Sequence, residues 1–130
     1  MRDLDQIKTI VVVMMENRSF DHMLGYRSML PIGADVDGQR ADPAWRRTCL
    51  NMDIGGEETE PFLNSNPYSL PPNFDPPHQR KDVAAHLGVK NNGVYPMNGF
   101  IKAIPSDVSP DPAVRRLVMS YYGAKEAPIN

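Results

Sequence analysis

The longest hydrophobic run in the chain covers the six residues from Ile10 to Met15 and ends directly at a polar segment. A continuous apolar run of this length is typical of a strand that is buried on both faces, as in a parallel sheet. We therefore predict a strand over residues 7–15. The polar segment opens with Glu16 and Asn17. Because ligands of open α/β sheets collect beyond the carboxyl ends of the strands, these two side chains are candidates for a functional site.

A short amphipathic pattern follows and predicts a helix over about residues 19–24. Its apolar positions lie on one face, at i, i+3 and i+4: Phe20, Met23 and Leu24. Asn17 or Ser19 is suited to cap the helix, and Gly25 is suited to end it with a positive φ. We expect Asp21 and His22 to project away from the apolar face, with His22 bonded to a backbone carbonyl behind the site.

The remainder of the chain shows mainly turn signals. Residues 31–77 predict an irregular loop, and prolines (13 in 130 residues) are about twice as frequent as usual. A short helix is expected over residues 79–87, ended by Gly88. Residues 113–122 are ambiguous, because Pro112 suits a helix start whereas the end of the segment suits a strand. The hydrophobic core that these elements can form is therefore small.

Composition excludes several classes of function. With 14 basic and 16 acidic residues and no charged block, the chain has no electrostatic footprint for nucleic acid and no polybasic membrane anchor. A single cysteine, Cys49, excludes an internal disulfide. The apolar run is too short for a transmembrane segment, and the acidic residues before it are not typical of a signal peptide. We expect a cytoplasmic protein if Met1 is the true start; the oligomeric state stays open.

Several segments resemble the bacterial phosphoesterase family that includes phospholipase C and acid phosphatases, in the alkaline-phosphatase-like superfamily. The most specific is Ile7 to Tyr26, with its E-N-R-S-F-D-H motif. Weaker similarities follow at F-D-P-P-H (Phe74 to His78), N-N-G-V-Y-P-M-N-G-F (Asn91 to Phe100) and V-M-S-Y-Y (Val118 to Tyr122), where Ser120 replaces a usual glycine. The resemblance implies an α/β fold: residues 1–130 would be the N-terminal portion of a doubly wound sheet with long irregular loops. Such a piece is a partial domain, incomplete in isolation.

The residues alone leave the roles of the candidate site residues open. Glu16 is either a ligand or the first solvated residue after a strand, Asn17 either a ligand or a helix cap, and His78 either catalytic or an ordinary surface histidine. The resemblance favours a divalent metal ion of unknown identity held by Glu16 and Asn17, with His78 in a catalytic role. Arg18 could clamp a phosphate, but an exposed or ion-paired arginine is favoured. Ser19 is interpreted as a cap and His86 as an ordinary helix residue.

The function implied by the resemblance is hydrolysis of phosphoric ester bonds by a phospholipase C-like or acid phosphatase-like enzyme. The substrate is a phosphoester, with a phospholipid head group as one candidate. The family's nucleophile, a Thr or Ser in a T-x-P-N-like segment, is expected beyond residue 130, so that we expect this piece to be inactive alone. Two alternatives remain: a non-catalytic module that binds a metal or an anion, and a truncated structural remnant.

Overall fold

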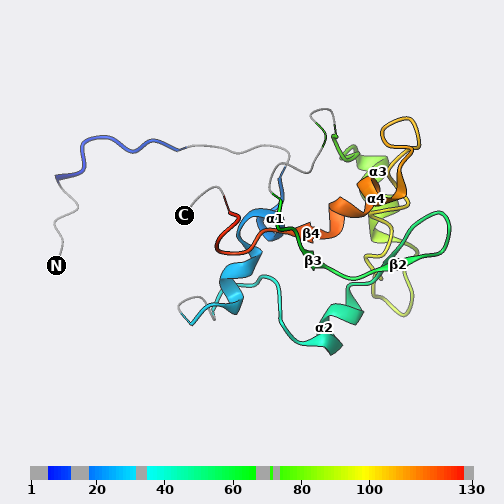
Figure 1. Ribbon diagram of the computed structural model, residues 1–130, viewed down its shortest axis with the longest axis horizontal. Helices are drawn as coiled ribbons and strands as arrows, with labels where there is room; N and C mark the ends of the chain where they lie inside the picture. The colour runs from blue at the N-terminus through cyan, green and yellow to red at the C-terminus, as the bar shows by residue number, and fades with distance from the viewer. Residues whose placement is uncertain (1–5, 13–17, 32–34, 67–70, 72–73, 128–130) are drawn as a thin grey trace.

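A computed structural model of the protein describes residues 6–12, 18–31, 35–66, 71 and 74–127. The fold is mixed α/β with two small sheets (Figure 1). Its elements, in which η denotes a 3₁₀-helix, are α1 (Phe20–Leu24), η2 (Gly25–Met29), α2 (Pro43–Thr48), β1 (Asn51–Met52), β2 (Glu58–Thr59), β3 (Phe62–Leu63), α3 (Arg80–Leu87), α4 (Pro112–Arg116), η3 (Leu117–Met119) and β4 (Ser120–Tyr121).

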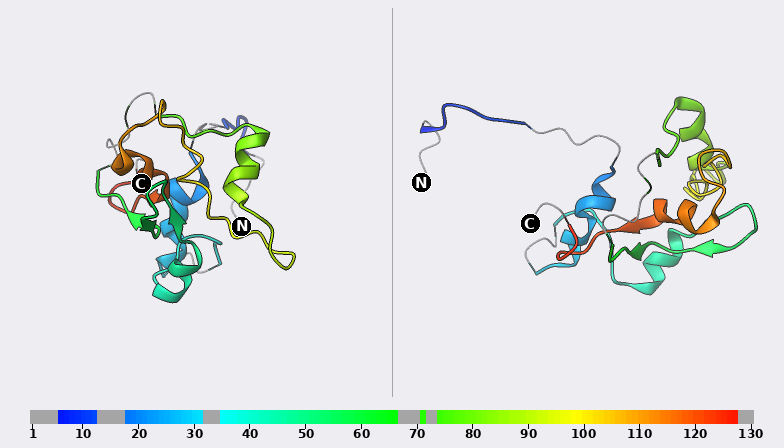
Figure 2. Two further views of the ribbon diagram at one scale, coloured as in Figure 1. Left: turned by 90° about the vertical axis from the view of Figure 1, so that its right-hand side faces the viewer. Right: turned by 45° about the horizontal axis from the view of Figure 1, so that its top comes forward.

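The two sheets join different parts of the chain. Strands β1 and β2 form a local antiparallel pair in which Asn51 faces Thr59. Strands β3 and β4 pair in parallel, with Phe62 beside Ser120, and both views of Figure 2 draw these two strands next to each other. Parallel strands require a long crossover between them, so that this pairing returns the end of the chain to its middle.

Helix α1 docks against β4 and forms the main core. The backbone N–H of Tyr122 donates to the carbonyl of His22 at 2.9 Å. The buried cluster around this contact consists of Met23, Tyr26, Tyr122 and Ala127, with Leu24 packed against it. The first resembling segment and the last therefore meet in space.

Two of the helices begin at the same tripeptide, Asp-Pro-Ala. Asp42 caps α2 by accepting from the N–H two residues later at 2.9 Å, and Asp111 caps α4 in the same way at 2.8 Å. In both helices proline occupies the first helical position, where its missing N–H costs nothing and its fixed φ suits the helix.

The strand expected over residues 7–15 is not formed in its described part, residues 7–12. Ile10, Val11 and Val12 are 80%, 78% and 83% exposed, and Figure 1 draws this segment apart from the sheets. A strand needs backbone partners at its edges and side chains over its faces. The described part of the chain supplies neither to these residues. Residues 13–15 of the expected strand lie outside the described residues, and the doubly wound sheet stays a prediction.

Other local expectations need correction. Residues 31–77 are not loop throughout, because α2 and three strands lie within them; Asp42 and Pro43 were the signal for α2. Gly25 has φ of −56°, so that the chain continues into η2 instead of ending in a left-handed turn. Gly88, by contrast, ends α3 with φ of 74°. At residues 112–121 the helix and strand alternatives both occur, one after the other.

Candidate functional site

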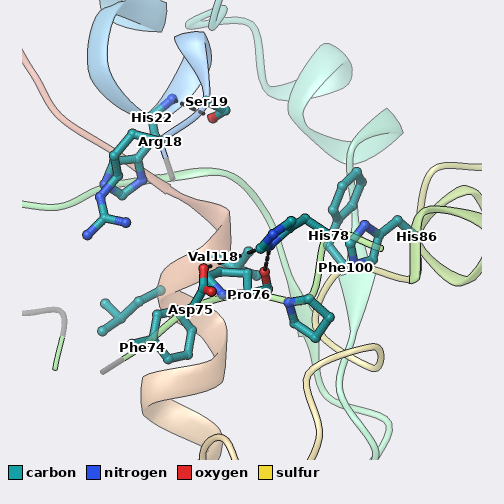
Figure 3. A pocket seen from close by; sticks show the side chains of 12 residues that line it. Arg18, Ser19, His22, Phe74, Asp75, Pro76, His78, His86, Phe100 and Val118 are labelled. Carbon is teal, nitrogen blue, oxygen red and sulfur yellow. Dashed lines mark hydrogen bonds and ion pairs between the residues drawn. The ribbon is translucent and has the colours of Figure 1, made fainter. Parts of the chain in front are cut away.

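A pocket of about 630 Å³ lies between α1, α3 and the segment that ends in β4. Its lining includes all three histidines of the chain, His22, His78 and His86, together with Arg18. Figure 3 shows Arg18 and His22 on one side, His86 and Phe100 on the other, and His78 between them. The rest of the lining is Ser19, Phe74, Asp75, Pro76, Pro77, Phe100, Leu117 and Val118.

His22 is the most firmly held of these side chains. Its Nδ1 lies 2.8 Å from the carbonyl oxygen of Ser120, which is in β4. Its ring meets that of Tyr122 edge-on, with centroids 4.5 Å apart. The expectation that His22 bonds a backbone carbonyl is therefore confirmed. The expectation that His22 projects away from the buried side of the helix is wrong, because α1 packs against β4 on this side and the side chain is buried.

The environment of His22 disfavours its charged form. Burial lowers the pKa of His22 below its usual value, because a charged ring loses its hydration. The bond to the Ser120 carbonyl acts in the opposite direction, and the positive charge of Arg18 adds to the lowering. The ring therefore stays neutral at neutral pH.

Ser120, which stands where the resemblance leads one to expect glycine, has a structural role. Its hydroxyl donates to the carbonyl of Leu117 at 2.7 Å and so fixes the step from η3 into β4. Its backbone carbonyl holds His22, and this second contact needs no side chain. A glycine at this position would keep the contact to His22 and lose the hydroxyl bond.

His78 lies in the pocket on an exposed segment, with 66% of its side chain accessible. Its Nδ1 donates to the carbonyl of Pro76 at 3.1 Å. When the ring is protonated, the Asp75 carboxylate at 3.9 Å provides a counter-charge. Two prolines precede His78 and restrict the backbone of the segment that carries it. The catalytic role of His78 stays a prediction.

The opposite wall is formed by His86 on α3 and Phe100. Their rings are stacked at 4.9 Å with an angle of 22° between the planes. Burial lowers the pKa of His86, opposed by the charge of Asp82. Nothing in the sequence distinguished His86 from an ordinary helix residue, whereas Phe100 closes one of the resembling segments.

A buried amide holds this wall in place. Asn51 is 1% exposed, and its Oδ1 accepts from the N–H of Phe100 at 2.8 Å. Its Nδ2 donates to the carbonyls of Met97 and Cys49 at 3.2 and 3.3 Å. Sequence reasoning missed Asn51, because an isolated asparagine next to a methionine carries no signal of long-range contacts.

Of the other candidates, Arg18 is half-buried in the pocket lining and Ser19 caps α1, its hydroxyl accepting from the N–H of His22 at 3.1 Å. Glu16 and Asn17, the expected metal ligands, lie outside the described residues. Among the residues that the structure describes, no three or more His, Cys, Asp or Glu side chains are grouped to share a metal ion.

None of the helices in that part has the length and apolar character that a membrane crossing requires.

The chain belongs to the Phosphoesterase family, whose sequence model matches residues 7–130. It is 31% identical to non-specific phospholipase C1 of Arabidopsis thaliana over 135 residues, which cover 95% of this chain and 21% of that protein. It is 26% identical to non-specific phospholipase C5 of the same plant, with 88% and 25% covered. The chain thus spans a quarter or less of the length of these relatives. No solved structure matches it significantly.

These comparisons confirm the expected family. They support hydrolysis of phosphoric esters as the chemistry at family level. The bacterial branch of the family stays a prediction, since the relatives named here are plant proteins.

Proposed function

We propose that this chain forms the phosphoryl-binding part of a phosphoester hydrolase of the phospholipase C type. The observation that carries the proposal is the pocket, in which a guanidinium and three imidazoles converge from segments far apart in the sequence. Two of the segments, those with Arg18 and His78, belong to the motifs that resemble the family. A phosphate group is the natural ligand for such a set of cationic and hydrogen-bonding side chains.

Arg18 and His78 have different roles in this proposal. Arg18 brings a fixed positive charge to the phosphoryl oxygens, and a guanidinium matches the geometry of phosphate well. His78, on the open side of the pocket, donates a hydrogen bond to the transferred group or a proton to the departing alcohol. Asp75 balances the charge of the protonated ring.

We further propose that Glu16 and Asn17 hold a divalent cation next to this pocket. The support is chemical: carboxylate and amide oxygens are hard ligands, and Arg18 follows them directly in the sequence. A bound cation would stabilise negative charge on the phosphoryl oxygens and lower the pKa of an attacking hydroxyl.

In this proposal, the attacking hydroxyl is not supplied by the 130-residue chain. Ser19, the hydroxyl-bearing residue of the E-N-R-S-F-D-H motif, is engaged as the cap of α1. We therefore expect the chain alone to leave p-nitrophenyl phosphate and p-nitrophenyl phosphorylcholine intact. The substrate class, a phosphomonoester or a phospholipid, depends on contacts that a longer protein provides.

The test is a chimera in which this chain replaces the matching segment of Arabidopsis non-specific phospholipase C1. We expect metal-dependent hydrolysis of p-nitrophenyl phosphorylcholine. Glu16→Gln should lower turnover by about 10²-fold or more, because a preorganised group that stabilises charge is typically worth several kcal/mol. His78→Ala should lower it by about 10²-fold, a common value for a group that transfers a proton.

Glu58→Gln, on the exposed strand β2, is the matched control and should leave turnover unchanged. A folded chimera in which Glu16→Gln and His78→Ala both turn over like the unsubstituted protein would refute the proposed roles. Hydrolysis by the 130-residue chain alone, lost in Glu16→Gln, would show that the attacking group lies within it.

A further inference from the structure

The loop that leads from the end of α3 to Phe100, residues 88–99, carries a concentration of exposed apolar side chains. All residues from 89 to 98 are exposed. The apolar ones among them are Val89 (87% exposed), Val94 (68%), Met97 (46%) and Tyr95 (44%). Single exposed apolar residues are ordinary on a protein surface, whereas a contiguous group of them marks an interaction surface.

The tip of the 88–99 loop is a tight turn that bonds to itself. Asn91 and Val94 exchange two backbone hydrogen bonds, each 2.9 Å long. Asn92 and Gly93 between them have positive φ, as in a two-residue hairpin turn. A methyl group added to Gly93 would meet no atom of the described residues within 4 Å, and the left view of Figure 2 draws the loop extending beyond the end of α3. The tip therefore projects from the body of the protein.

The base of the 88–99 loop fixes it to the wall of the pocket. The N–H of Met97 donates to the carbonyl of Leu87 at 3.0 Å, and the N–H of Gly99 donates to the carbonyl of His86 at 3.1 Å. His86 and Phe100, on either side of this base, are the stacked rings of the pocket wall. A surface that binds the loop is therefore held next to the pocket.

The charge around the loop is of one sign. Residues 83–106 contain neither Asp nor Glu, and their side chains with a full charge at neutral pH are Lys90 and Lys102. Acidic residues nevertheless outnumber basic ones in the chain as a whole. The ammonium of Lys90 lies over the ring of Tyr95, 5.4 Å from its centroid. An aromatic ring beside a lysine suits a membrane interface, where the ring lies at the level of the head groups and the ammonium reaches the phosphates.

We propose that the 88–99 loop docks on a phospholipid surface. Val89, Val94 and Tyr95 enter the boundary between the head groups and the acyl chains, and Lys90 binds anionic phosphates. The docked loop places the pocket beside phosphoesters in that surface. This inference deepens the proposed function, because it names the physical state of the substrate. The docking itself requires no hydrolysis and is tested separately.

The competing occupant of the loop is the rest of a longer protein, since the chain spans a quarter or less of the length of its relatives. A narrow turn offers little area for protein packing, whereas shallow insertion into lipid needs only a few apolar side chains. The self-bonded turn also suits lipid, because a backbone group without a partner is costly there. The absence of acidic residues from 83 to 106 matches an anionic surface.

Flotation of the 130-residue chain with vesicles of phosphatidylcholine, alone or mixed with phosphatidylglycerol, tests the docking. We expect binding to both kinds of vesicle, and tighter binding to the mixture. The double substitution Val89→Asn/Val94→Asn should weaken binding at least about tenfold, because the two apolar side chains no longer leave water. Lys90→Gln should weaken binding to the mixture about fivefold, which is the contribution of one lysine near an anionic surface.

Val12→Asn is the matched control, because Val12 is 83% exposed and lies outside the loop. This variant should bind vesicles like the unsubstituted chain. A loss in the control as large as in the double variant would show that apolar exposure anywhere in the chain is sufficient, and it would refute the inference. Absence of binding to both kinds of vesicle, or full binding by the double variant, would do the same.

Tyr95→Trp locates the contact without removing the apolar side chains. Brominated acyl chains quench a tryptophan that touches them. We expect strong quenching in this variant and weak quenching in the unsubstituted chain, whose single tryptophan, Trp45, is on α2. Equal quenching in the two proteins would overturn the inference, even if the double variant failed to fold.

The chimera distinguishes lipid from protein as the occupant of the loop. In the chimera, Val89→Asn/Val94→Asn should keep the hydrolysis of soluble p-nitrophenyl phosphorylcholine and lower that of phosphatidylcholine in vesicles about tenfold. Equal losses on both substrates would show that the loop packs against protein, contrary to the inference. An inactive chimera together with vesicle binding by the 130-residue chain rejects the proposed function alone. An active chimera whose hydrolysis of vesicles is unchanged by the double substitution rejects this inference alone.

Discussion

Replacing Asn51 with alanine should destabilise the protein and loosen the pocket at the same time. The substitution removes one hydrogen bond to the N–H of Phe100, at 2.8 Å, and two longer bonds to the carbonyls of Cys49 and Met97. A short bond of this kind contributes about 1 kcal/mol net. The two longer bonds contribute about half as much each, because water can reach carbonyls near the surface. With the lost packing of a fully buried side chain, we expect a decrease of about 2–3 kcal/mol in the free energy of unfolding.

Urea unfolding, followed by the fluorescence of the single tryptophan, Trp45, measures this change. Asn98→Ala, at an exposed asparagine, is the matched control and should stay within about 0.5 kcal/mol of the unsubstituted protein. Asn51→Ala should also loosen the pocket wall that His86 and Phe100 form, since Phe100 loses its anchor. A loss below about 0.5 kcal/mol would refute the reasoning that this amide holds the loop to β1.

Three further predictions concern stability. Gly99→Ala would place a methyl group on the carbonyl oxygen of Ala85, so that the loop carrying residue 99 must separate from α3. We expect the free energy of unfolding in urea to fall by about 2 kcal/mol or more. An unchanged urea midpoint would show that this loop and α3 do not pack together. Because burial lowers the pKa of His22 and of His86, the unfolded chain binds more protons below about pH 6.5, and the free energy of unfolding should fall between pH 7 and pH 5. A urea midpoint that stays constant or rises over this range contradicts it. Asp111→Ala removes the cap of α4 and should cost about 1 kcal/mol, with faster amide exchange in that helix; exchange at the original rate would count against the cap.

Local sequence accounts for the helix ends. The Asp-Pro-Ala tripeptides, the Ser19 cap and the left-handed Gly88 each depend on residues within one turn of each other. Their physical cause is the same in any protein, which is why such signals can be found without a structure. The E-N-R-S-F-D-H motif likewise indicated the family without knowledge of the fold.

The partners of Ile10 to Val12 could not be predicted in this way. The hydrophobic run favours a strand buried on both faces, yet these three residues are exposed and pair with no strand in the part of the chain that the structure describes. A strand gains its stability from other strands and covering helices, and no local pattern shows whether these are present.

The same distinction applies to the site. Local sequence was enough to single out Glu16, Asn17 and His78 as candidates, and the resemblance of their segments to a known family indicated phosphoester chemistry. The meeting of His22 with the Ser120 carbonyl, and of Phe100 with Asn51, was decided by contacts between segments far apart in the chain. Burial and hydrogen-bond partners depend on which distant groups surround a side chain, and only the folded chain brings those groups together.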